Sequence, residues 1–199
     1  MKTLEITFTF LSPWHMGSGF GEGPNLDAVP VKSPAGLPFI PGRSVKGLFR
    51  EAFLLAEECG RLQAGTTCRL FGSRDQGLSR YDSTAGCLHF DSATLGEAME
   101  VWAFAVDEQG KRKNAGAVRQ LFMTLSSTRI DEDGLACDKT LRKIEVALPV
   151  TLTARIEGAD PDSNLTDALE IAASLIRQAG VHRHRGLGRV TITVKEVRS

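Results

Sequence analysis

The sequence lacks a strong charge of either sign, a secretion signal and a closely paired cysteine motif. Lysine and arginine number 24, aspartate and glutamate also number 24, and the formal net charge of zero gives no indication of a polyanionic partner. Residues 1–10 alternate polar and apolar side chains, without the basic head and apolar core of a signal peptide or membrane anchor. We therefore expect a cytoplasmic protein with no membrane partner, in which any nucleic acid is bound by local groups of basic residues.

Cysteine is scarce, and its four positions contain no CxxC pair. In a chain without an export signal these thiols are expected to stay reduced. Cys59, Cys68, Cys87 and His89 could together supply the soft ligands of a zinc site, although the gaps between them are long and irregular for a zinc ribbon. The alternative is that the thiols are buried and act as small hydrophobic side chains.

What is present is the composition of a folded domain. Hydrophobic residues make up 42% of the chain and charged residues 24%, which excludes a disordered, collagen-like or disulfide-scaffold protein. At roughly 150 residues per domain, the chain is expected to form one elaborated domain that spans residues 1–199.

Two periodicities alternate along the chain and predict its core. Apolar residues at every second position, as from Leu4 onward, predict half-buried strands, and apolar residues at the 3.6-residue period predict two helices. The first helix is expected to begin at Ser44 and to end before Gly60, and the second to follow residues 160–164 and to be closed by Gly180. Strands are expected at residues 2–11, 87–90, 101–106, 144–156 with a break at Pro149, and 190–194.

This order of elements matches the ferredoxin-like, RRM-type β-α-β-β-α-β plan of an α+β protein, with long inserted loops. Residues 12–41 form a long segment rich in glycine and proline, and residues 61–86 resemble a loop. Residues 117–127 are compatible with either a short helix or an irregular segment, and residues 131–134 carry a turn signal. Function is expected in these long connections, because loops of this length in compact domains are usually functional or disordered.

A basic, glycine-rich segment near the C-terminus has the sequence HRHRGLGR. It places Arg183 and Arg185 before Gly186 and Gly188, with Arg189 after them. Glycine lets a backbone approach a phosphate closely, and arginine forks onto phosphate oxygens. The segment therefore predicts a clamp for a phosphate backbone. The alternative is a glycine helix cap followed by a solvated basic turn.

A second basic element, IPGRSVKGLFR, opens the first predicted helix. Arg43, Lys46 and Arg50 lie near the N-terminal turns of that helix, where cations oppose the helix dipole unless an anion sits among them. An RNA phosphate would relieve this repulsion. The alternative is that these side chains are simply solvated, since the dipole effect is under about 1 kcal/mol.

Five segments, taken in order, resemble one protein family. WHMGSG follows the first strand, and after it come LPFIPGRSVKGLFREA, CRLFGS, GCLHFDSA and GVHRHRGLGRV. Together they span nearly the whole chain and resemble the RAMP superfamily of CRISPR-associated proteins, more narrowly the backbone subunits of type III effector complexes. The resemblance implies a ferredoxin-like core that polymerises along a guide RNA and displays it to a complementary target RNA in antiviral defence.

The resemblance also implies which residues bind RNA and which partners are present. A hairpin, or thumb, that interrupts the guide–target duplex is expected at about residues 116–133. The expected partners are the guide (CRISPR) RNA, the complementary target RNA, other copies of this chain and other effector subunits. The residues that match the two guide-contacting loops of the family are Gly42, Arg43, Ser44 and Lys46 in the first loop and Gly186, Gly188 and Arg189 in the second.

In the cleaving members of the family, an aspartate in the loop after the first strand is required for metal-dependent cutting of the target RNA. Asp27 occupies the matching position. The implied chemistry is transesterification, in which a 2′-hydroxyl attacks the adjacent phosphate and leaves a cyclic phosphate. A carboxylate can orient or deprotonate that hydroxyl or hold Mg²⁺ or another divalent ion. The alternative is that Asp27 is a solvated loop residue and the subunit only binds RNA; Glu22 is a nearby competitor for the catalytic role.

His15 supports a second enzymatic hypothesis. Guide-processing endoribonucleases of the same superfamily often use a histidine near this position as an acid or a base. They usually have two ferredoxin-like domains, whereas 199 residues leave little room for a second. We favour a structural role in which His15 packs under a glycine loop or hydrogen-bonds its backbone. A domain that binds some other anionic partner is a more distant alternative.

Overall fold

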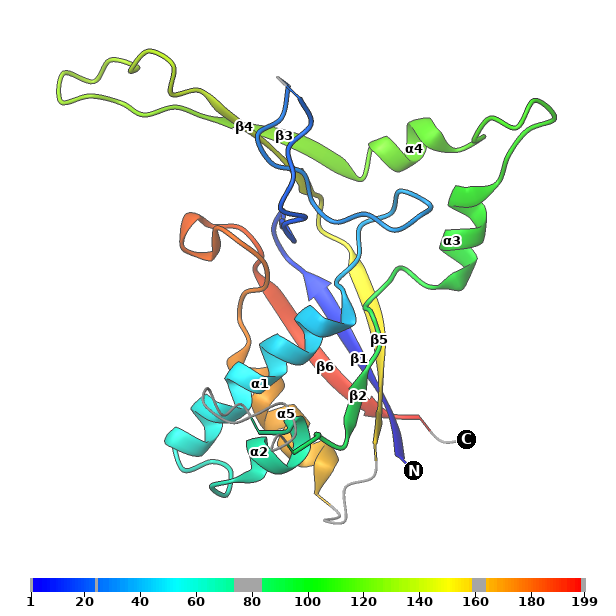
Figure 1. Cartoon of the computed structure of the whole chain (residues 1–199), viewed down its shortest axis with the longest axis vertical. Helices are drawn as coiled ribbons and strands as arrows, with labels where there is room; N and C mark the ends of the chain where they lie inside the picture. The colour runs from blue at the N-terminus through cyan, green and yellow to red at the C-terminus, as the bar shows by residue number, and fades with distance from the viewer. Residues whose placement is uncertain (1, 24, 74–83, 159–163, 198–199) are drawn as a thin grey trace.

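The computed structural model describes residues 2–23, 25–73, 84–158 and 164–197. Its centre is a four-stranded antiparallel sheet in the order β2-β5-β1-β6. Helices α1 and α5 lie on the same side of this sheet (Figure 1). The core elements are β1 (Lys2–Phe10), α1 (Gly42–Glu58), β2 (Leu88–Phe90), β5 (Thr151–Gly158), α5 (Leu165–Leu175) and β6 (Val190–Glu196). This is the β-α-β-β-α-β order of a ferredoxin-like fold, so the predicted α+β class is confirmed.

Strand β1 is the central strand and carries the pattern that predicted it. Leu4, Ile6, Phe8 and Phe10 are buried against the helices, and the odd-numbered residues between them lie on the other face. Ile6 lies opposite Ala154 on one side and Val194 on the other, so three strands contribute to one apolar layer. Phe8 meets Phe49 of α1 edge to face, with ring centroids 6.5 Å apart, which joins the sheet to the first helix.

The boundaries of both core helices differ from the prediction. Helix α1 begins at Gly42, with Pro41 as its N-cap, two residues before the expected Ser44. A Cβ at Gly42 would lie 2.3 Å from the Phe90 carbonyl oxygen, so this start packs directly onto β2. Helix α5 ends at Leu175, and the prediction that Gly180 closes it is wrong. Gly180 instead lets the chain pass His15, whose carbonyl oxygen would lie 2.5 Å from a Cβ there.

A large insertion separates β2 from β5 and projects away from the sheet (Figure 1). It contains α3 (Glu97–Phe104), α4 (Ala115–Arg119) and the hairpin of β3 (Phe122–Ser127) with β4 (Arg142–Ala147). The expected turn at residues 131–134 is present, because Asp131 Oδ1 accepts the N–H groups of Asp133 and Leu135. The stretch at about 116–133 therefore covers α4, β3 and this turn, while the pairing strand β4 lies beyond it.

Two predicted elements are corrected within this insertion. The strand expected at 101–106 is wrong, since residues 97–104 form helix α3. The strand expected at 144–156 is two strands from different sheets, and the segment with Pro149 joins them. The open choice for 117–127 resolves into the end of α4 followed by β3. No helix among the described residues is long and apolar enough to cross a membrane.

One further helix occupies the segment expected to be a loop. Helix α2 (Thr66–Phe71) packs against the end of α1, where Phe71 lies 5.0 Å from Phe53 between ring centroids. Glu57 of α1 accepts hydrogen bonds from the Thr67 hydroxyl, at 2.5 Å, and from the N–H of Gly65, at 3.0 Å. Burial raises the pKa of Glu57, but these hydrogen bonds outweigh burial and lower the pKa from its ordinary value of 4.5.

Candidate nucleic-acid interface

The long loop after β1 is fastened to the inserted hairpin. Trp14 and Ala147 exchange two backbone hydrogen bonds of 2.9 and 2.8 Å. Farther along, the Asp27 N–H donates to the Lys143 carbonyl at 2.8 Å. The segment 14–28 of the loop is therefore attached to β4 at its two ends, through an antiparallel bridge at Trp14 and a parallel bridge at Ala28, so both ends are held in position relative to the hairpin.

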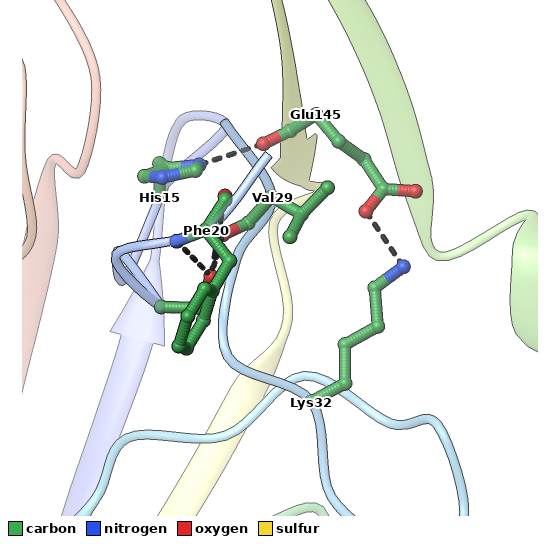
Figure 2. A network of polar contacts seen from close by, with 6 residues as sticks. His15, Phe20, Val29, Lys32 and Glu145 are labelled. Carbon is green, nitrogen blue, oxygen red and sulfur yellow. Dashed lines mark hydrogen bonds and ion pairs between the residues drawn. The ribbon is translucent and has the colours of Figure 1, made fainter. Parts of the chain in front are cut away.

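His15 lies at the centre of this junction (Figure 2). It is 2% exposed, and its Nδ1 donates to the Glu145 carbonyl oxygen at 2.7 Å. The Val181 N–H donates to the His15 carbonyl at 2.9 Å, so His15 connects the hairpin to the C-terminal loop. Burial lowers the pKa of His15 below its ordinary value of 6.5, which favours the neutral imidazole. The side chain of Glu145 in turn pairs with Lys32 at 2.6 Å. These contacts give His15 a structural role, which is to brace the hairpin against the C-terminal loop.

The outer part of the same loop forms a small hairpin of its own. Ser18 Oγ donates to the Val29 carbonyl at 2.8 Å and accepts the Phe20 N–H at 3.1 Å (Figure 2). Phe20 is 75% exposed, so it gains almost nothing from the core. An aromatic ring held in this way is available for contact with a ligand.

Asp27 lines a cleft of about 590 Å³ between this loop, the base of the β3–β4 hairpin and the C-terminal loop. Asp27 Oδ2 accepts the Lys143 N–H at 2.7 Å, while Oδ1 makes no hydrogen bond within the described part of the chain. Arg142, His182 and Arg185 line the same cleft. One carboxylate oxygen is therefore fixed by the hairpin, and the other remains available in a cleft with two arginines and a histidine.

The C-terminal loop that closes this cleft has a defined shape. His182 and Gly186 adopt left-handed backbone conformations, at φ +57° and +83°, on either side of a short 3-10 helix at Arg183–Arg185. Gly188 has φ +73°, and a Cβ there would lie 2.0 Å from the Ala179 carbonyl oxygen. The Gly188 N–H also donates to the Pro13 carbonyl at 2.8 Å. Gly188 is thus used for close backbone packing that holds the loop against the segment after β1, whereas Gly186 supplies only the left-handed turn.

A second groove, of about 340 Å³, lies where the two predicted basic elements meet. Arg43 and Ser44 at the start of α1 line it together with Gly180 and Arg183 from the C-terminal loop. A neighbouring groove of about 390 Å³ between α1 and α5 shares Arg183 and adds His184. Residues about 140 positions apart in the sequence therefore line two neighbouring grooves that share Arg183. Glu51 lines both grooves as well, so the basic side chains lie beside one acidic side chain.

The remaining predicted RNA-binding residues lie elsewhere. Arg50 faces α2, where its Nη2 donates to the Gly72 carbonyl at 3.1 Å. Lys46 is half-buried, and Gly42 is packed against β2. Arg185 lines the Asp27 cleft and not the groove, and Arg189 is exposed where its N–H donates to Ser12 Oγ at 3.0 Å. Sequence reasoning missed Arg142, which lies just before the period-two pattern that began at Ile144 and so fell outside the predicted strand.

Neither sequence-based interpretation of the cysteines fits the structure. Cys59, Cys68 and Cys87 are exposed, so they are not buried hydrophobic side chains. His89 is exposed as well and lies 3.5 Å from Asp91. Across residues 2–23, 25–73, 84–158 and 164–197, no three histidine, cysteine or acidic side chains are grouped to hold a metal ion. The candidate zinc residues are therefore not brought together as a site.

Comparison with known proteins gives a family and a fold. Many solved chains match, and two of them illustrate the similarity over nearly their whole length. One, from the apo cryo-EM structure of the Type III-B Cmr-beta complex, is 12% identical with a TM-score of 0.66, over 100% of this chain and 98% of its own. The other, from Cmr-beta bound to cognate target RNA, is 10% identical with a TM-score of 0.66, over 98% and 97%. Among curated protein sequences none matches.

The family model of the RAMP superfamily matches residues 7–145. This range begins within β1, contains α1 and β2, and ends within β4, so it includes both the loop with Asp27 and the first basic element. The chain belongs to the RAMP superfamily.

Proposed function

We propose that this chain is a backbone subunit of a type III CRISPR effector complex, which holds a guide RNA in the groove of Arg43 and Arg183 and cleaves the complementary target RNA in the Asp27 cleft. The matches to Cmr-beta chains, one of them from a complex with target RNA, support the type of assembly. The observation that carries the catalytic part is Asp27 itself, with one carboxylate oxygen fixed to the hairpin and the other free in a cleft.

The groove is suited to a strand bound through its phosphates. Arg43, Ser44 and Arg183 offer charge-assisted and hydroxyl hydrogen bonds, and Gly180, which has a left-handed backbone, leaves the groove wall without a side chain at that point. None of these groups reads a base edge. Sequence would therefore be read by pairing between guide and target, while the protein recognises the backbone.

The cleft is suited to strand cleavage by a neighbouring 2′-hydroxyl. Asp27 Oδ1 would accept the hydrogen bond of that hydroxyl and take its proton as the 2′-oxygen attacks the phosphate. The rigid attachment of Asp27 to Lys143 matters here, because attack geometry is lost with small displacements. The products would be a 2′,3′-cyclic phosphate and a 5′-hydroxyl.

A divalent metal ion is part of the proposal. Among the described residues Asp27 is the acidic side chain of this cleft, so its charge would attract Mg²⁺ that RNA oxygens and water ligate, while Oδ1 stays available to the 2′-hydroxyl. Such an ion would supply positive charge at the phosphate. Because one carboxylate is not a complete metal site, the ion would bind with the target RNA and not before it.

Two other functions fit the structure less well than target cleavage at Asp27. A guide-processing role for His15 requires an imidazole that reaches RNA, whereas His15 is buried with Nδ1 bonded to Glu145. A purely structural subunit would use the groove and leave the cleft without a role.

The test uses the effector complex purified with its guide. Labelled complementary RNA and a scrambled RNA are added in Mg²⁺ or in EDTA, and product ends are identified by mass spectrometry. We expect cutting of the complementary RNA alone, in Mg²⁺ alone, with cyclic phosphate ends. Tight binding without cutting would establish the structural subunit, and equal binding of both RNAs would contradict the guided function.

A further inference from the structure

The wall of the Asp27 cleft contains ionisable and basic side chains in addition to Asp27. His182 and Arg185 line it from the C-terminal loop, and Arg142 lines it from β4. Together with Asp27, the cleft thus contains a carboxylate, an imidazole and two guanidinium groups from three separate segments. The HRHRGLGR motif divides between two sites, because His184 lines the groove between α1 and α5 instead.

His182 is held in the cleft by its backbone. It has φ +57°, a conformation that non-glycine residues adopt rarely and mainly where the surrounding structure enforces it. The Arg185 N–H donates a hydrogen bond to the His182 carbonyl at 2.8 Å, and the N–H of the preceding Val181 donates a hydrogen bond to the His15 carbonyl. In contrast, the imidazole of His182 is exposed and makes no hydrogen bond within the part of the chain that the structure describes. The position is therefore fixed while both ring nitrogens remain available to a ligand.

We propose that His182 is the proton donor to the leaving 5′-oxygen during target cleavage, and that Arg142 and Arg185 hold the scissile phosphate. The inference rests on the proposed function, since it names a second catalytic group for that reaction. The 2′-hydroxyl gives its proton to Asp27 as its oxygen bonds to phosphorus, and the bond from phosphorus to the 5′-oxygen breaks. That oxygen takes a proton from the His182 imidazolium, leaving a cyclic phosphate, a 5′-hydroxyl and a neutral imidazole.

The residue types match the needs of each position. An alkoxide is a poor leaving group unless it is protonated, and imidazole is the side chain best suited to donate a proton near neutral pH. Negative charge accumulates on the phosphate as the 2′-oxygen attacks, and arginine pairs with phosphate oxygens through two parallel hydrogen bonds. Asp27 and His182 come from different segments of the cleft wall, so one can act on the attacking oxygen and the other on the leaving oxygen.

The test compares two target RNAs that differ in one atom. One has the natural linkage at the cut site, and the other has sulfur in place of the bridging 5′-oxygen, which leaves as a thiolate and needs no proton. Single-turnover cleavage is measured in the assembled complex for wild type, His182→Asn, His89→Asn and Asp27→Asn. His89 provides the matched control, because it is exposed on β2 and lines neither the cleft nor the grooves. Asparagine tolerates a left-handed backbone, so it preserves the loop while it removes the acid. Target affinity is measured in parallel by filter binding.

We expect His182→Asn to slow cleavage of the natural RNA by about 100-fold or more, the usual contribution of a general acid. The same variant should cut the sulfur-linked RNA at close to the wild-type rate, with unchanged affinity. His89→Asn should match wild type on both RNAs, and Asp27→Asn should be inactive on both. Equal loss on both RNAs for His182→Asn, or no loss on the natural one, would overturn the inference. Absence of cutting by wild type would instead contradict the proposed function.

Discussion

Replacement of His15 tests whether this histidine braces the site or performs chemistry. In His15→Ala the Glu145 carbonyl loses its donor in a buried position, a loss of about 1–3 kcal/mol. Removal of the buried ring also leaves a cavity, and large-to-small substitutions in cores add about 2 kcal/mol or more. We therefore expect the free energy of unfolding to fall by about 3–5 kcal/mol at pH 7.5, measured by urea denaturation.

The pH dependence of stability supplies a second readout for the same residue. Burial lowers the pKa of His15 in the folded chain, so below pH 6.5 the unfolded chain binds more protons than the folded one. The contribution of His15 to the free energy of unfolding is therefore complete above pH 6.5. It declines as the pH falls below this value, by at most about 1.4 kcal/mol per pH unit for one proton. Subtracting the His15→Gln curve from the wild-type curve should isolate this decline.

Two outcomes would refute the bracing role of His15. A loss of less than about 0.5 kcal/mol in His15→Ala would place it among ordinary surface substitutions. Cleavage abolished in a His15→Gln complex that assembles and binds target normally would indicate direct participation in chemistry. We expect this variant to cut within a few-fold of wild type, because glutamine can still donate to Glu145.

Two further predictions concern other parts of the chain. The pKa of Glu57 is lowered in the folded chain, so its contribution to stability is present above pH 4.5 and is lost as the pH falls through the folded pKa. Glu57→Gln should therefore reduce the change in Tm between pH 5 and 3. An unchanged dependence of Tm on pH would contradict the role of the Glu57 hydrogen bonds. Arg43→Ala and Arg183→Ala should each reduce the slope of log affinity for guide RNA against log salt by about 0.7, the value for one phosphate contact on a single strand, whereas Arg50→Ala, whose side chain faces α2, should leave that slope unchanged.

The core was predictable because burial and periodicity agree there. The alternating apolar residues of β1 and β6 and the apolar stripe of α1 face one buried layer. A period of 2 or 3.6 residues in the sequence therefore identifies the buried side chains directly. The insertion was not predictable in this way. Of α3 only Ala103 is buried, while Val101 and Phe104 are exposed. Because these apolar residues do not mark a buried helix face, the sequence pattern predicted a strand although the backbone is helical.

The site was predictable only in its parts. The glycines and arginines of the two basic elements signalled a phosphate site, but their meeting in one groove depends on the sheet order that places β1 beside β6. Arg142 carried no local signal, because its role arises from the attachment of the loop after β1 to β4. The helix end expected at Gly180 failed for a related reason, since that glycine serves the contact with His15 and not a helix cap.

The most direct test of the Asp27 cleft is target cleavage by complexes that contain Asp27→Asn. Asparagine keeps an oxygen for the Lys143 N–H and removes the negative charge, so the hairpin attachment is preserved. The turn aspartate Asp131 provides the matched control as Asp131→Asn. We predict that Asp27→Asn complexes assemble and bind target RNA like wild type but do not cut it, while Asp131→Asn complexes cut normally. Cutting by Asp27→Asn at the wild-type rate and positions would contradict the placement of catalysis in this cleft.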